Sequence, residues 1–145
     1  MPMRYRYLPH MADVAFVAYG STFKKAIENA GMALLNVMFD LKRIQRTGKG
    51  VVFTNISASA RSREDLVWKI LQKVVSKLDE NGEQAFSFRV LMLDEKEGSF
   101  KVKCRLKIRK TKKYMSLLEV KAVTPHGLEV KKDRGIWRVR VLIDV

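Results

Sequence analysis

Apolar and polar residues follow two different periods along this chain, and each change of period predicts a change of element. Two segments have apolar residues three and four positions apart, as on one face of a helix. The first follows the capping residues Ser21 or Thr22, and its apolar face comprises Phe23, Ala26, Ile27, Ala30, Leu34, Val37 and Met38. The second follows Ser62 and ends at Asn81-Gly82, and its buried positions are Val67, Ile70, Leu71, Val74 and Leu78. Trp68 lies beside that face and is expected at its edge.

Most of the remaining chain alternates with period two, as in strands that bury one face. The expected strands are 4–8, 14–19, 51–60, 86–92, 100–109, 118–123, 128–131 and 136–145, with a polar and basic loop at 42–50. In the fourth strand, Phe86, Phe88, Val90 and Met92 are expected on the same face. The order of elements predicts an α+β fold of one domain over residues 1–145, in which two helices pack on a mostly antiparallel sheet.

Composition agrees with a folded domain and adds a strong positive charge. With 145 residues, 47% of them apolar and 30% charged, the chain is long enough for one core. Its net charge is +14, and residues 99–145 contribute most of it, with 14 Lys or Arg against 4 Asp or Glu. Such a field favours polyanions or an acidic partner surface, although a solubilising surface is the alternative. Residues 1–6 lack a secretory core, so we expect a cytoplasmic protein.

The sequence offers little support for catalysis. Cys104 is the only cysteine and alternates with lysines in a strand, which favours a buried structural thiol over a nucleophile. There are only two histidines and no nucleophile-elbow motif, dinucleotide fingerprint or Walker loop. The basic loop at 42–50 contains glycines but lacks the spacing of a phosphate-binding loop. A hydrolase would have to depend on His10 near Asp13, and we therefore expect no enzyme.

Two acids near opposite ends of the chain suggest a cation site instead. Asp13 follows Pro9 in a short turn, and Asp144 lies beside Val145, whose α-carboxylate is a further oxygen donor. If the first and last strands meet, Asp13, Asp144 and Val145 converge, and oxygen ligands of this kind suit calcium or another divalent cation. The alternative is that Asp13 caps its turn and Asp144 is a solvated residue. His10 is better explained as a packed turn residue than as a ligand.

The basic strand and loop at 101–113, which begin and end with Lys101 and Lys113, could bind RNA. RNA-binding modules usually combine positive charge with stacking aromatic side chains. Apart from Phe100, which is expected on the apolar face of the strand, Tyr114 is the only aromatic residue close to this segment in sequence. The segment therefore predicts nonspecific affinity for RNA without sequence readout.

Several segments together resemble the archease family, and the resemblance extends over nearly the whole chain. They are YLPHMADV at 7–14, AYG at 18–20, NVMFD at 36–40, DLV at 65–67, LEVKAVT at 118–124, HGLEV at 126–130 and IDV at 143–145. Met11 stands where threonine is usual, and Pro125 where tyrosine is expected. Neither difference removes an acid, but the segment 124–126 could contact a partner differently.

The resemblance implies an α+β protein cofactor of the GTP-dependent tRNA-splicing ligase of the RtcB class. Such a cofactor promotes guanylylation of the ligase and multiple turnover. The family's calcium site would lie on Asp13, Asp144 and Val145, and Asp40 is a weaker addition that we leave out. The expected function is therefore a non-catalytic ligase activator in tRNA splicing, and the alternative is a basic RNA-binding or RNA-chaperone module.

Overall fold

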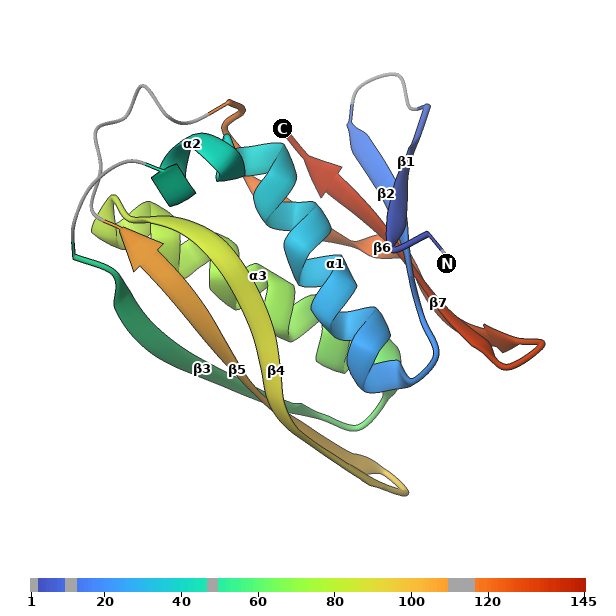
Figure 1. The fold of residues 1–145 in the computed structure, drawn as a ribbon. Helices are drawn as coiled ribbons and strands as arrows, with labels where there is room; N and C mark the ends of the chain where they lie inside the picture. The colour runs from blue at the N-terminus through green and yellow to red at the C-terminus, as the bar shows by residue number, and fades with distance from the viewer. Residues whose placement is uncertain (1–2, 10–12, 47–49, 110–116) are drawn as a thin grey trace.

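Two antiparallel sheets and three helices form the fold in a computed structural model that describes residues 3–9, 13–46, 50–109 and 117–145 (Figure 1). The four-stranded sheet has the order β1-β2-β7-β6, and the three-stranded sheet has the order β3-β5-β4. The strands are β1 (Tyr5–Leu8), β2 (Val14–Gly20), β3 (Val52–Ala60), β4 (Gln84–Lys96), β5 (Ser99–Arg109), β6 (Ala122–Asp133) and β7 (Ile136–Asp144). The helices are α1 (Phe23–Met38), α2 (Leu41–Arg46) and α3 (Arg63–Asn81).

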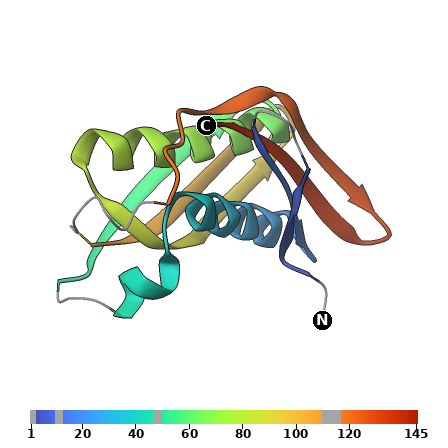
Figure 2. The same ribbon diagram turned by 90° about the horizontal axis from the view of Figure 1, so that it is seen from above.

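The two long helices lie between the two sheets and share one core with them. Helix α1 contacts β2 and β4, and α3 contacts β6 and β3, so each helix joins one sheet to the other (Figure 1). The hairpin of β6 and β7 extends from one side of the molecule (Figure 2). The fully buried core includes large side chains from both helices and both sheets: Phe16, Phe88, Ile27, Leu34, Leu35, Ile70, Leu71, Leu106 and Ile108.

Local sequence signals set the ends of the long helices, as predicted. The hydroxyl of Thr22 accepts a hydrogen bond from the backbone N–H of Lys25, at 3.1 Å. Ser62 accepts the corresponding bond from Asp65, also at 3.1 Å. Gly82 ends α3 in the left-handed region, with φ of 60°, where glycine has no steric penalty. These contacts satisfy backbone groups that have no partner within the helix.

Four features of the fold differ from the sequence-based expectation. The strands form two sheets, where one was expected, because α1 and α3 separate them. Part of the expected loop at 42–50 is helix α2, which begins after Asp40, and Asp40 Oδ1 accepts a hydrogen bond from Arg43 N at 3.2 Å. No strand covers residues 118–121, because β6 begins at Ala122. The segment 124–126 belongs to β6, at a register shift between Thr124 and Glu129.

The expected alternation of Phe86, Phe88, Val90 and Met92 is wrong at both ends. Register shifts occur between Ala85 and Ser87 and between Val90 and Met92. An extra residue at a bulge reverses the face of every side chain beyond it. Phe88 and Val90 are therefore buried, whereas Phe86 is only half-buried and Met92 is 56% exposed.

Helix side chains bind backbone groups on three of the outer strands. On β4, the N–H of Val90 donates to Glu28 Oε2 at 3.0 Å and that of Phe88 to Met32 Sδ at 3.3 Å. On β6, both backbone groups of Val123 are bound by α3: Trp68 Nε1 donates to the carbonyl at 2.7 Å, and Gln72 Oε1 accepts from the N–H at 2.8 Å. On β3, two lysines of α3 donate to backbone carbonyls, Lys69 to Ser59 and Lys73 to Ser57.

An arginine at the start of α3 connects distant parts of the fold. The Arg63 guanidinium lies 5.7, 5.0 and 5.2 Å from the ring centroids of Phe23, Phe100 and Trp137. Its Nε also contacts Glu95 at 3.3 Å. These rings belong to α1, β5 and β7, so one side chain contacts elements of both sheets. Within the described ranges, no helix is both long enough and apolar enough to span a bilayer.

Candidate functional site

The pairing of β2 with β7 places Asp13 and Asp144, the two acids of the candidate metal site, next to the same end of the paired segment. These strands are antiparallel, and their last paired positions are Val14 and Ile143. Asp13 precedes Val14 and Asp144 follows Ile143, so one further step of the same register would put the two acids across from each other. Directly opposite residues in an antiparallel pair have Cα atoms about 4.5–5.5 Å apart. The last strand therefore pairs with β2, the strand that follows Asp13, and not with the first strand β1, which among the described strands pairs only with β2. This register leaves Asp13 and Asp144 each one residue beyond the last paired positions, and their convergence on a cation stays a prediction.

Neighbouring contacts hold Asp144 in place from its other side. Strand β6 pairs Ala122 with Asp144, and the N–H of Lys121 donates to the Asp144 carbonyl at 2.9 Å. Asp144 is exposed, whereas Asp13 and Val145 are half-buried. Ile143 is fully buried and anchors the strand next to them. The start of β2, the end of β7 and the C-terminal end of α1 all lie at one end of the molecule (Figure 1).

The donor chemistry at this edge suits a hard cation. Two carboxylates and a main-chain oxygen of Val145 are ligands that calcium accepts, with water completing its shell of six to eight oxygens. Among the described residues, no group of three or more His, Cys, Asp or Glu side chains could hold a metal ion. A site formed by the described residues alone would therefore use the two acids together with main-chain or water oxygens. His10, expected to be a packed turn residue, and Met11 lie outside the described residues.

Tyr7 attaches the strand before the turn to helix α1. Its hydroxyl donates to the Ala33 carbonyl at 2.9 Å and accepts from Asn36 Nδ2 at 3.2 Å. Burial raises the pKa of Tyr7 above its ordinary value. The ring also packs edge-on against Phe16, with centroids 6.2 Å apart. Tyr7 therefore anchors the end of β1, which precedes Asp13 in sequence, to helix α1.

Cys104 lies in the core, as predicted, and is not placed for catalysis. It is fully buried in β5. Burial raises the pKa of its thiol to about 12. Since the thiolate is the nucleophilic form, a thiol with this pKa is unreactive near neutral pH.

The predicted basic face is confirmed for β5, and the structure adds residues that sequence proximity did not reveal. Lys101, Lys103, Arg105 and Lys107 are exposed and alternate with buried apolar residues. Beside them, Phe53 on β3 exposes 56% of its surface. Phe53 is far from this segment in sequence, and only the β3–β5 pairing brings it there. Lys113 and Tyr114 lie outside the described residues.

Comparison with known proteins gives one consistent family. Residues 5–145 match the model of the Archease protein family (MTH1598/TM1083). Among relatives named protein archease, that of Methanosarcina barkeri is 32% identical over 145 residues, covering 98% of this chain and 96% of the relative. That of Methanosarcina mazei is 28% identical over 144 residues, with the same coverage.

Solved structures agree on the fold. The solution structure of Methanobacterium thermoautotrophicum protein 1598 matches with a TM-score of 0.81 and 23% identity, covering 98% of this chain and 99% of the other. A Thermotoga maritima protein, described as an archease and possible chaperone, matches with a TM-score of 0.55 and 20% identity, covering 100% and 99%. The α+β class predicted from the sequence is confirmed. Because the family model covers nearly all of the sequence, this chain belongs to the archease family.

Proposed function

We propose that this protein is a non-catalytic activator of the RtcB-type, GTP-dependent tRNA-splicing ligase. In this proposal it promotes guanylylation of the ligase and multiple turnover, and it uses a calcium-type site at Asp13, Asp144 and Val145. Family membership supports the choice of partner. The observation that supports the site is the β2–β7 register, which pairs Val14 with Ile143, the direct neighbours of Asp13 and Asp144.

A divalent ion would have a direct physical role at this edge. Two carboxylates on adjacent strands repel each other, and a bound cation removes that repulsion. An ion held at an exposed edge can also stand near the phosphates of a nucleotide, where its charge offsets theirs. Asp13 and Asp144 would hold the ion, and the oxygen atoms of Val145 would complete the protein's contribution. The exposed position of Asp144 leaves room for a partner to approach.

The first experiment measures calcium binding without the ligase. Calcium at 100 times its Kd should stabilise the wild-type fold by about 2.7 kcal/mol through linkage. The variant Asp144→Asn should lose this stabilisation and yet fold normally in the absence of calcium, because it removes one of two facing charges. Asp133→Asn is the matched control: it removes an exposed carboxylate at the other end of the same hairpin, 3.6 Å from Arg138. Equal calcium stabilisation in wild type and Asp144→Asn would exclude the site.

The second experiment measures RNA ligation by the cognate ligase with GTP and a substoichiometric amount of this protein. The proposal expects many turnovers per ligase only when the protein is present. Asp13→Ala and Asp144→Ala should abolish the stimulation, whereas Asp133→Asn should retain it. If the Asp13→Ala protein is folded and still stimulates the ligase fully, activation does not require the metal site. No stimulation by the wild type would refute the ligase proposal itself.

A further inference from the structure

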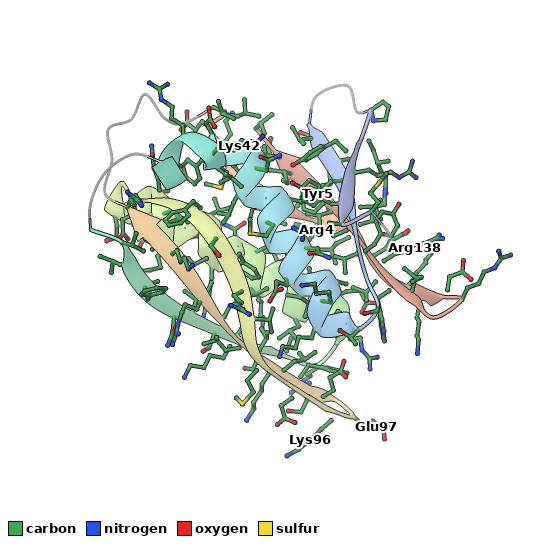
Figure 3. All side chains as sticks on the ribbon, viewed as in Figure 1. Arg4, Tyr5, Lys42, Lys96, Glu97 and Arg138 are labelled. Carbon is green, nitrogen blue, oxygen red and sulfur yellow. The ribbon has the colours of Figure 1, made fainter. Side chains whose placement is uncertain are left out.

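The outer face of the three-stranded sheet carries a cluster of positive charges and, among its paired neighbours in the described strands, a single acid at the hairpin end. Five basic residues contribute to it, four from β5 and one from β4: Lys101, Lys103, Arg105, Lys107 and Arg89, all exposed. None of the five forms an ion pair with an acid in the part of the chain that the structure describes. Asp94, opposite Lys101, is the single acid paired with this row in the β4–β5 register, and it lies at the hairpin end. Figure 3 shows the hairpin tip, with Lys96 and Glu97, projecting beyond the rest of the sheet.

Two of these charges face each other directly. Arg89 and Arg105 are paired across β4 and β5 on the same face. Directly opposite residues have Cβ atoms about 4.5–5.5 Å apart, and like charges in this arrangement destabilise a sheet. A polyanion bound over the face would remove the repulsion. The facing arginines therefore cost folding stability, and this cost is explained if the face binds a polyanion.

An exposed aromatic ring lies within the same cluster. Phe53 is paired with Lys107 across β3 and β5. The Arg105 guanidinium is 5.7 Å and the Lys107 ammonium 5.9 Å from the ring centroid. Arg105 is held in place by a hydrogen bond from its Nε to Asn55 Oδ1, at 3.1 Å. An exposed ring between oriented cations provides both a stacking surface and phosphate ligands.

We propose that this outer face, centred on Phe53 and the row from Lys101 to Lys107, binds single-stranded nucleic acid. Cations at every second position of a strand repeat at about 6.8 Å, a spacing suited to successive phosphates of an extended strand. Bases stack on an exposed aromatic ring regardless of their sequence, and nearby arginine adds to the stacking energy. An acidic protein surface would use the charges but would not require the ring. This proposal does not depend on the ligase or on the metal site.

The test measures binding of a labelled oligouridine and of an oligothymidine by fluorescence anisotropy over a range of salt concentrations. Five phosphate contacts predict a slope of log affinity against log salt of about −3.5. Lys103→Ala with Lys107→Ala should reduce the slope by about 1.4, which corresponds to roughly 25-fold weaker binding at 0.1 M salt. The matched control is Arg4→Ala with Lys24→Ala, which removes two exposed cations elsewhere, one near β1 (Figure 3) and one on α1. It should change neither the salt slope nor the affinity.

Phe53 distinguishes nucleic acid from an acidic protein. Phe53→Leu should weaken oligonucleotide binding roughly 5- to 150-fold while the salt slope stays unchanged, because stacking and not charge is lost. Phe53→Trp should retain the affinity. Since Phe53 is largely exposed, both variants should keep the melting temperature of the wild type.

Two results would overturn the proposal. One is the absence of oligonucleotide binding by the wild type at moderate salt. The other is that polyglutamate displaces the labelled oligonucleotide as effectively as unlabelled oligouridine does, and that Phe53→Leu changes the affinity for neither ligand. That result would assign the face to an acidic protein partner. The calcium and ligation experiments with Asp144 variants have separate readouts, so either proposal can fail without the other.

Discussion

Gly31 allows helix α1 to lie directly against β4, and replacing it with alanine should destabilise the fold. A Cβ atom at Gly31 would overlap the ring of Phe88, coming within 2.5 Å of its Cε1 and closer still to Cγ and Cδ1. Phe88 is only 2% exposed, so its ring has no solvent to move into. The backbone on both sides is fixed as well, because the N–H of Phe88 is bound to Met32 Sδ.

Two opposing terms determine the size of the effect. Alanine is favoured over glycine inside a helix by about 1 kcal/mol. Overpacking of a filled core costs about 1–3 kcal/mol, and occasionally more. The overlap involves three atoms of one ring, which places Gly31→Ala at the upper end of that range. We therefore expect a net loss of about 2 kcal/mol in the free energy of unfolding. For a domain of about 150 residues this corresponds to a melting temperature roughly 4–8 °C lower.

A double-mutant cycle measured by chemical denaturation tests both the size of the stability loss in Gly31→Ala and its cause, the contact with Phe88. Phe88→Leu alone should also destabilise the protein, because it leaves a cavity. In Gly31→Ala with Phe88→Leu the smaller side chain makes room for the new methyl group, so the double variant should lose about 1–2 kcal/mol less than the sum of the single losses. If Gly31→Ala were as stable as the wild type, or if the two changes were additive, the close approach would not be the reason for a glycine here.

Three further predictions concern the helix contacts and the core. Arg63→Leu removes three cation–ring contacts and should cost about 1.5–3 kcal/mol in urea denaturation; the exposed neighbour control Arg61→Leu should stay within about 0.5 kcal/mol of wild type. Glu28→Ala leaves the N–H of Val90 without its acceptor and should cost about 1–3 kcal/mol, and Glu28→Gln should restore most of that stability. Cys104 should resist alkylation until the protein unfolds. Because burial raises its pKa from 9.0 to about 12, its contribution to stability is complete below pH 9 and falls as the pH rises towards 12, so the advantage of wild type over Cys104→Ala should shrink across that window.

Much of this fold could be predicted from local patterns, and the exceptions have identifiable causes. The helix faces and the alternation of β5 were correct because they depend on residues close together in sequence. The faces of Phe86 and Met92 were wrong because each bulge in β4 shifts the register, and alternation alone does not locate bulges. Helix α2 was missed because its six residues are mostly polar and too few to show a helical period. The division into two sheets depends on where α1 and α3 pack, which strand patterns do not reveal.

The candidate sites differ in how far the sequence could indicate them. The sequence-based expectation was that the first and last strands meet, whereas the last strand pairs with β2, the strand directly after Asp13. The role of Asp13 and Asp144 as metal ligands stays a prediction. Phe53 was not associated with the basic strand because it lies some fifty residues earlier, and pairing across β3 and β5 brings it beside Lys107. Aromatic residues at alternating, outward positions of a neighbouring strand are the signal that could have indicated it.

The helix side chains bound to β3, β4 and β6 limit how another polypeptide can join this protein. Addition of a strand from a partner requires free N–H and C=O groups along a sheet edge. At Ser57, Ser59, Phe88, Val90 and Val123 such groups are already bound by lysine, methionine, glutamate, tryptophan or glutamine side chains. Of the outer strands the structure describes, β1 alone has no such side chain on its backbone. A partner strand at these positions of β3, β4 or β6 would first have to displace the helix side chains, whereas β1 could accept one without that cost.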